Sequence, residues 1–355
     1  MLWTRRGALA TLLGIAAAVA GSIMATVATG SMPVRPHRAV ALDARFGCST
    51  AVVGASPIAS ARTVFVAVPG PPFGVAAARV GHWIFVDEVG RELLVLRDDS
   101  FAPRIVRSIR LPYGAPLGMT LTPDGRYLLI ADVMNGVWVV SVARAEHGER
   151  SPVLGTLFEP GQLDMGGGAI EVATSRNGQY VFVSLERRDQ VAVYDLGEAL
   201  AEHFRTLGYV GVVRLGIAPV GLAVSPNGRW LYATSEASSH GPEGTLSVIN
   251  VAVAERSPKH AVWASVPAGC SPVRVALSPD GRIAWVTARG SDALLAFSTQ
   301  ALIRHANGLR AVIPVGEAPV GVAVVAHGAL IVVGNYGGQW SLEAISVKSS
   351  EQPQG

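Results

Sequence analysis

One short turn pattern recurs along the chain and constrains its fold more than any other feature. Each copy centres on a glycine, usually preceded by Asp or Asn and followed by a segment rich in aromatic and aliphatic residues. The six glycines are Gly81, Gly125, Gly178, Gly228, Gly281 and Gly328. Their spacings run from 44 to 53 residues, a period typical of propeller blades rather than of helical repeats. The first constraint is therefore a repeated β-unit.

Alignment on these glycines predicts four short strands in each repeat. A strand leads into the turn, a second follows it, a third reads as VWVVSV in one copy, and a fourth is more variable. Asp-Gly and Asn-Gly turns between such segments favour hairpins. We therefore predict an all-β propeller of four-stranded blades, with six blades as the main expectation and seven as the alternative. The last repeat stops after its third strand, so the strand Thr63 to Val68 is expected to close the ring.

Two repeats carry a family resemblance. PVGLAVSPNGRWLYATS, from Pro219, and PVRVALSPDGRIAWVTA, from Pro272, are similar to the YVTN family of lactonase-like propeller repeats. The resemblance extends over residues 72–347 and implies the propeller fold. It leaves function open, because such propellers serve as lactonases, binding proteins and surface scaffolds.

Composition excludes two classes of protein. Half of the 355 residues are hydrophobic and 15% are charged, so an intrinsically disordered chain is excluded. Lys and Arg number 29 against 26 Asp and Glu. The basic residues are scattered rather than clustered, so no nucleic-acid partner is expected.

The N-terminal region predicts export. Arg5 and Arg6 precede an uncharged stretch from Gly7 to Val34, the pattern of a secretory signal peptide or of an uncleaved membrane anchor. We expect residues 1–29 to be this segment, 30–60 a tether, 61–347 the propeller and 348–355 a disordered tail. The body would then be secreted, periplasmic or in the cell envelope, with membrane contact only through an uncleaved N-terminal segment.

Two charged residues break the repeat at its most crowded position. The third residue of the innermost strand is glycine in four repeats, but it is Glu171 in the third and Arg274 in the fifth. An unpaired buried ion costs several kcal/mol, so the two should be paired or hydrated. They form either a polar ligand site in the channel or a structural ion pair that fills it.

Further candidates lie in the loops between the second and third strands. These loops share one face of the ring, here called the mouth face, where a small polar molecule or a protein or peptide is the expected partner. The polar ends of ordinary loops are the alternative explanation. The candidates are Asp87, Glu88, Asp132, Asn135, Glu186, Glu236, Arg289, Asn335 and Tyr336.

No catalytic motif accompanies these candidates. The chain has no GxSxG, HExxH or paired CxxC sequence, which disfavours the corresponding serine hydrolases and zinc sites. We expect no cofactor and no metal, although mouth carboxylates could hold Ca²⁺. The leading hypothesis is a ligand- or protein-binding propeller. The alternative is a lactonase-like hydrolase that uses the mouth carboxylates.

The two cysteines provide one further expectation. In an oxidising compartment Cys48 and Cys270 can pair, provided that the fold brings them together.

Overall fold

The computed structural model describes residues 68–70, 72–78, 81–88, 91–98, 103–112, 114–134, 136–158, 167–239, 241, 243–325, 330–336 and 341–346. Within these ranges the chain forms six antiparallel sheets, five of four strands and one of three. The first sheet comprises β1 (Pro72–Ala77), β2 (Trp83–Glu88), β3 (Glu92–Arg97) and β4 (Arg104–Arg110). The second comprises β5 (Pro116–Leu121), β6 (Tyr127–Asp132), β7 (Gly136–Ser141) and β8 (Val153–Leu157). The third comprises β9 (Ala169–Thr174), β10 (Tyr180–Leu185), β11 (Gln190–Asp195) and β12 (Tyr209–Arg214).

The remaining sheets repeat the same order. The fourth comprises β13 (Ile217–Val224), β14 (Trp230–Ala237), β15 (Glu243–Asn250) and β16 (Val262–Cys270). The fifth comprises β17 (Pro272–Leu277), β18 (Ile283–Ala288), β19 (Ala293–Ser298) and β20 (Leu309–Pro314). The sixth comprises β21 (Pro319–Val325), β22 (Leu330–Asn335) and β23 (Ser341–Ser346).

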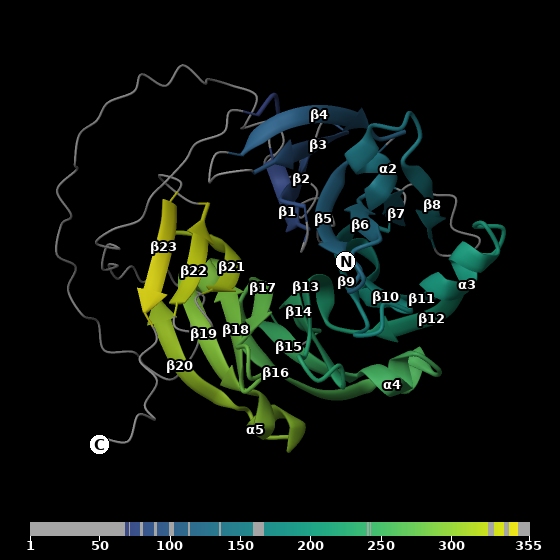
Figure 1. Cartoon of the computed structure of the whole chain (residues 1–355). Helices are drawn as coiled ribbons and strands as arrows, with labels where there is room; N and C mark the ends of the chain where they lie inside the picture. Colours follow the sequence, from purple (N-terminus) through teal and green to yellow (C-terminus); the bar gives the residue numbers. More distant parts are fainter. Residues whose placement is uncertain are drawn as a thin grey trace, which may run out of the picture.

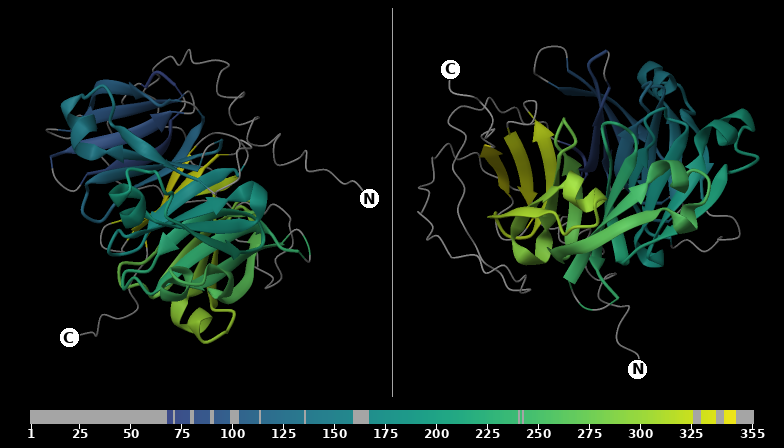
Figure 2. Two further views of the ribbon diagram at one scale, coloured as in Figure 1. Left: turned by 90° about the vertical axis from the view of Figure 1, so that its right-hand side faces the viewer. Right: turned by 90° about the horizontal axis from the view of Figure 1, so that it is seen from below.

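The sheets are arranged as propeller blades. Figure 1 shows them around a common centre, with the first strand of each sheet innermost. The views in Figure 2 show the yellow strands of the sixth sheet next to those of the fifth. Neighbouring strands pair in sequence order within every sheet, so each blade is a simple meander. The predicted all-β propeller and its repeat boundaries are confirmed.

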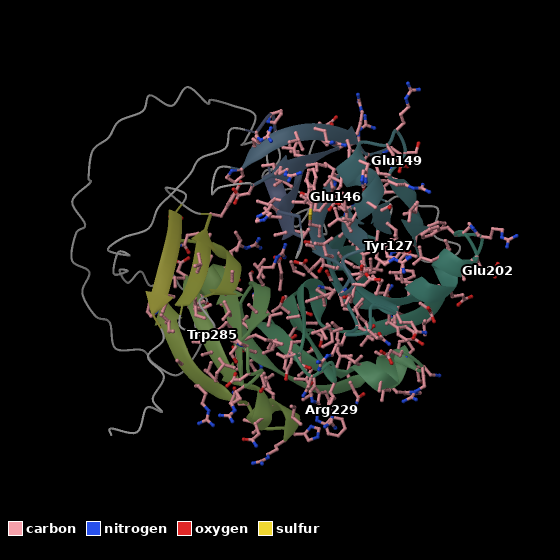
Figure 3. The ribbon with its side chains drawn as sticks, viewed as in Figure 1. Tyr127, Glu146, Glu149, Glu202, Arg229 and Trp285 are labelled. Carbon is pink, nitrogen blue, oxygen red and sulfur yellow. The ribbon has the colours of Figure 1, made fainter. Side chains whose placement is uncertain are left out.

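Apolar side chains fill the seams between sheets. Phe85 of the first sheet packs with Met119 and Ile130 of the second, and Trp285, labelled in Figure 3, packs between the fifth and sixth sheets. The seams make a series of separate cores, because the second to fifth sheets each pack against a neighbouring sheet on both faces. Among the fully buried aromatic residues, Tyr232 lies on β14, the second strand of its sheet, and Tyr194 lies on β11, the third strand of its sheet.

Close approach of the innermost strands explains the repeated glycine. A Cβ on Gly74 would lie 2.5 Å from the carbonyl oxygen of Leu117, and one on Gly221 would lie 2.4 Å from that of Val273. No side chain fits at such distances. Two positions further along the inner strands, Ala76 and Ala173 pack against the apolar clusters between sheets. Ala173 also lines a cavity together with Glu171.

In the described part of the chain, four short helices connect third to fourth strands, and they were not expected from the sequence. They are α2 (Val142–His147), α3 (Leu196–Ala201), α4 (Val251–Ala254) and α5 (Thr299–Ile303), and they lie at the rim in Figure 1. A polar N-cap at the end of the preceding strand begins each one; in α3 it is Asp195, which accepts the backbone N–H of Glu198 at 2.9 Å. At four to six residues they are too short to show helical periodicity.

Ring closure remains a prediction. The expected closing strand falls on residues 63–68, of which only Val68 is described; it packs on the face of the first sheet that carries Val86, Leu94 and Leu96. The signal or anchor segment, the tether and the tail also lie outside the described residues. In the part of the chain that is described, no helix is long and apolar enough to span a bilayer.

The structure bears on one of the two cysteines that were expected to pair. Cys270, buried at the end of β16, is disulfide-bonded. The other cysteine of the chain, Cys48, lies outside the described residues.

Candidate functional site

The two charged residues that replace glycine meet in the channel. Nε of Arg274, on β17, lies 3.0 Å from Oε2 of Glu171, on β9, and the two side chains are 19% and 17% exposed. Burial raises the pKa of Glu171, and the guanidinium of Arg274 opposes this rise. The predicted pairing is confirmed. The role of either residue in ligand binding remains a prediction.

A second ion pair lies beside the first. Nη2 of Arg289 is 2.9 Å from Oε1 of Glu236, with side-chain exposures of 24% and 19%. Glu236 is the penultimate residue of β14, the second strand of the fourth sheet, and Arg289 is the first residue of the 3₁₀ turn η3 (Arg289–Ser291). Burial raises the pKa of Glu236, while Arg289 and then Arg274 lower it. The electric field of Arg274 therefore links the two pairs.

A third acid joins this group from the third sheet. Glu186, in the 3₁₀ turn η1 (Glu186–Arg188), is buried. Burial, followed by the charge of Glu236, raises its pKa to about 7, against the opposing effect of Arg187 and Arg289. A carboxyl group with this pKa is partly protonated at neutral pH, so it can both accept and return a proton. Sheets three, four and five thus contribute one group of interacting acids and guanidinium groups, here called the channel cluster: Glu171, Glu186, Glu236, Arg274 and Arg289.

The guanidinium of Arg274 has an unused donor. Its Nη1 is buried without a hydrogen-bond partner, and its Cζ lies 5.7 Å from the ring centroid of Phe73. A buried N–H that lacks an acceptor is costly, so an oxygen atom of a ligand would find a ready partner there. A cavity of about 290 Å³ is lined by residues of the inner strands β5, β9 and β13, and Glu171 is the member of the channel cluster that lines it.

Asp87 was expected at the mouth but is fully buried within the ring. Its Oδ1 accepts the backbone N–H of Gly74 at 2.8 Å. Burial raises the pKa of Asp87 to about 8, the hydrogen bond from Gly74 opposes this, and the charge of Glu171 adds to the rise. Asp87 is therefore the neutral neighbour of the channel cluster at pH 7.

In other sheets a hydroxyl group takes the place of Asp87. Thr234 Oγ1 accepts from the N–H of Gly221 at 2.9 Å and donates to the carbonyl of Val273, in the next sheet, at 2.8 Å. Ser184 and Thr287 occupy the same aligned position and also accept the N–H of the third inner-strand residue. These residues were missed in the sequence reading, although alignment of the second strands contains the signal.

Other candidates serve the structure of individual sheets. Glu88 accepts the N–H of Gly70 at 2.7 Å. Asp132 accepts from the N–H of Met134 at 2.8 Å and from Nε1 of Trp138 at 2.9 Å. Both acids are buried. These local bonds agree with the alternative explanation, that loop ends are polar for local reasons, and a role of the two acids in ligand binding remains a prediction.

The last three candidates, Asn335, Tyr336 and Asn135, belong to other repeats of the sequence than the residues of the channel cluster. Asn335 is buried at the end of β22 next to Gly316, and the N–H of Tyr336 donates to the carbonyl of Ala318 at 3.0 Å. Asn135 lies outside the described residues. Within the described ranges no group of three His, Cys, Asp or Glu side chains is arranged to hold a metal ion.

Comparisons with known proteins place this site in a family context. A family model described as lactonase, seven-bladed β-propeller, matches residues 115–339. The structure of the periplasmic gluconolactonase PpgL of Pseudomonas aeruginosa is 26% identical, with a TM-score of 0.59 over 74% of this chain and 78% of that chain. Kuenenia stuttgartiensis hydrazine synthase has a TM-score of 0.60 at 15% identity over 78% and 83% of the chains, which shows the fold alone. No curated protein matches this sequence.

The blade number in that description agrees with the larger of the two numbers that the sequence allows. The described residues form six sheets, the number that was the main expectation.

Proposed function

Because this chain belongs to the lactonase family of seven-bladed β-propellers, we propose that it is a hydrolase that opens a lactone ring at the channel cluster. The observation that carries the proposal is the buried Nη1 of Arg274, which lacks a hydrogen-bond partner and lies among carboxylates with raised pKa values. An empty donor beside potential bases is what ester hydrolysis needs.

Four residues of the cluster have a role in this proposal. The carbonyl oxygen of the lactone accepts a hydrogen bond from Arg274, which stabilises the negative charge that develops there. Glu186, with a pKa of about 7, accepts a proton from the attacking water. Arg289 holds Glu236 at 2.9 Å, and the charge of Glu236 keeps Glu186 basic.

The proposed reaction balances without a further reactant. The water oxygen forms a bond to the carbonyl carbon, and its proton passes to the Glu186 carboxylate. The bond between that carbon and the ring oxygen then breaks, and the ring oxygen takes the proton from Glu186. The product is a hydroxy acid, and the enzyme returns to its starting state.

The substrate that fits best is a small hydroxylated lactone. The side chains of the cluster are charged and largely buried, so they favour a compact ligand with many hydrogen-bonding groups. Export belongs to the same proposal: the N-terminal segment has the pattern of a signal or anchor, and the related gluconolactonase is described as periplasmic.

The test is an assay of hydrolysis on a panel of aldonolactones, in the presence of Ca²⁺ and of EDTA. Hydrolysis is monitored as proton release above the spontaneous rate. Glu186→Gln should lower kcat by at least about 10²-fold if Glu186 is the base. Glu202→Gln, at an exposed site on the rim, is the control and should be unchanged. Lactone binding without turnover in the wild-type protein would overturn the hydrolase proposal in favour of a binding propeller.

A further inference from the structure

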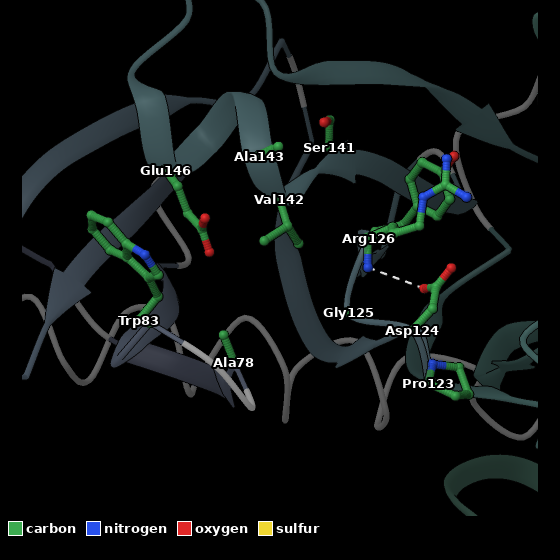
Figure 4. Close-up of a pocket in the computed structure, with 12 residues that line it drawn as sticks. Ala78, Trp83, Pro123, Asp124, Gly125, Arg126, Ser141, Val142, Ala143 and Glu146 are labelled. Carbon is green, nitrogen blue, oxygen red and sulfur yellow. Dashed lines mark hydrogen bonds between the residues drawn. The ribbon is translucent and has the colours of Figure 1, made fainter.

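A second cavity, of about 590 Å³, lies between the first two sheets. Its lining includes the turns at Gly81 and Gly125, the side chain of Trp83 and the helix α2 (Figure 4). Trp83 begins β2, whereas Asp87, the neighbour of the channel cluster, lies four residues further along the same strand. At about 3.3 Å per residue, the cavity and the channel cluster lie toward opposite ends of the sheet.

Comparison with other seams explains why this space is open. The aromatic residue that begins a second strand packs against an aliphatic residue of the helix in the next sheet: Tyr127 belongs with Leu200 of α3 in one apolar cluster, and Trp230 with Ile303 of α5 in another. Counted from the helix N-cap, the same position in α2 is Glu146. In this seam the carboxylate of Glu146 therefore occupies the position that Leu200 and Ile303 occupy in the other two seams.

An acid also occupies the equivalent position of α4. There the residue is Glu255; burial raises its pKa, the charge of Arg256 opposes this rise, and the charge of Asp195 adds to it. Glu146 forms no ion pair or hydrogen bond with any side chain in the described part of the chain. Burial raises its pKa, and the one opposing charge is His147, the next residue in α2. Figure 4 shows its carboxylate pointing into the space beside Trp83.

The other charged residues of the cavity are already engaged. Asp124 accepts from the hydroxyl of Thr122 at 2.6 Å and from the N–H of Arg126 at 3.0 Å. The guanidinium of Arg126 lies over the ring of Tyr127, 5.5 Å from its centroid. The lining therefore has two carboxylates and one guanidinium, a negative balance that favours a cation.

Trp83 supplies a fixed apolar wall. A Cβ on Gly81, whose φ is +85°, would lie 2.8 Å from Cδ1 of Trp83, so the turn is built to admit the ring. Arg97 covers the ring, with Cζ 5.2 Å from its centroid. Val142, the first residue of α2, also lines the space.

We propose that this cavity is a binding site for an organic cation, in which the Glu146 carboxylate receives an ammonium or guanidinium group and Trp83 and Val142 contact its alkyl stem. The site is separate from the channel cluster and does not depend on lactone hydrolysis. The cation is either a free amine or the side chain of a peptide lysine, which present the same chemistry.

The experiment is calorimetric titration of the full chain with 1,5-diaminopentane, with 1,5-pentanediol as the uncharged probe. The diamine should bind and the diol should not. Glu146→Gln and Glu146→Leu should each weaken diamine binding at least about tenfold, as expected when a charge-assisted hydrogen bond is lost. The matched control is Glu149→Gln, an exposed acid paired with Arg144 close to the same helix, and it should bind as the wild type does.

Two further measurements keep the test decisive. Glu146→Leu copies the seam that contains Leu200, so its thermal midpoint should equal or exceed that of the wild type, and lost binding then cannot reflect unfolding. A titration with an acetylated, amidated dilysine peptide separates the two sources of the cation by their relative affinities. Equal binding of diol and diamine, or unchanged binding in both Glu146 variants, would overturn the proposal. Lactone turnover should be unaffected by these variants.

Discussion

Arg274 and Glu171 form an ion pair between two sheets that are separated by a third, with Nε and Oε2 3.0 Å apart. Each residue stands where other repeats have glycine. The pair therefore joins the third and fifth sheets through the centre of the ring. Its energy depends on how much water reaches it, because desolvation and attraction oppose each other.

A double-mutant cycle measures this coupling. Glu171→Gly should destabilise the protein toward the lower end of the roughly 3–5 kcal/mol found for broken buried pairs, because part of each side chain is exposed. Changing both residues to glycine should recover part of the loss, since it restores the residue of the other repeats. The measurement is the free energy of unfolding from denaturant titrations. The control pair, Arg205 and Glu202, has the same 3.0 Å separation but is 77% and 46% exposed; Glu202→Gln should cost about 0–1 kcal/mol. Additive losses at Glu171 and Arg274 would show that the two charges do not interact.

The pH dependence of hydrolysis should follow Glu186. A general base works in its ionised form, so kcat/KM should rise with pH through about 7, the pKa of Glu186. Glu236→Gln removes a negative charge that raises this pKa and frees the positive Arg289. Both effects favour ionised Glu186, so the midpoint of the profile should move to lower pH. A midpoint that stays in place would exclude Glu186 as the titrating base.

Stability should also depend on pH through Asp87. The pKa of Asp87 is about 8 in the folded protein, whereas the ordinary value for an aspartic acid is 3.8. The folded state therefore holds the proton more tightly than the unfolded state. The stability that this group contributes is complete below about pH 4 and is lost as the pH rises toward 8. Asp87→Asn keeps an uncharged acceptor for the N–H of Gly74 and should flatten this dependence. Unfolding free energies of both proteins at pH 6 and pH 9 provide the comparison, and parallel losses in the two would contradict the assignment.

Gly118 should tolerate no side chain. A Cβ there would lie 2.6 Å from the carbonyl oxygen of Ile170 and 2.7 Å from Oε1 of Glu171. Gly118→Ala should therefore destabilise the protein by about 1–3 kcal/mol, as overpacked cores do. Gly321 holds the same repeat position, but its nearest neighbour is 3.7 Å away, so Gly321→Ala is the control. The difference in thermal midpoint between the two variants is the readout, and equal midpoints would contradict the steric explanation.

The candidate site was only partly predictable. Glu171 and Arg274 could be found because they interrupt a repeated glycine, and a charge in a crowded channel needs a partner. Asp132 and Glu186 were equally plausible as polar loop residues. Asp132 binds an indole and a backbone N–H of its own sheet, whereas Glu186 lies near Glu236 and Arg289 from other sheets. Local sequence does not distinguish these environments.

The repeat period, the hairpin turns and the alternation of side chains determined the all-β propeller and the order of its strands, because these depend on contacts between residues close in sequence. Only the tertiary structure decided which charges share the channel, that Asp87 is buried beside Gly74, and that Glu146 faces an open seam. The first and the last depend on distances between different sheets, and Asp87 is bonded to Gly74 within its own sheet but is buried by the packing of the ring. The pKa of a carboxyl group depends on such distances and on its burial, so residue type alone leaves it undetermined.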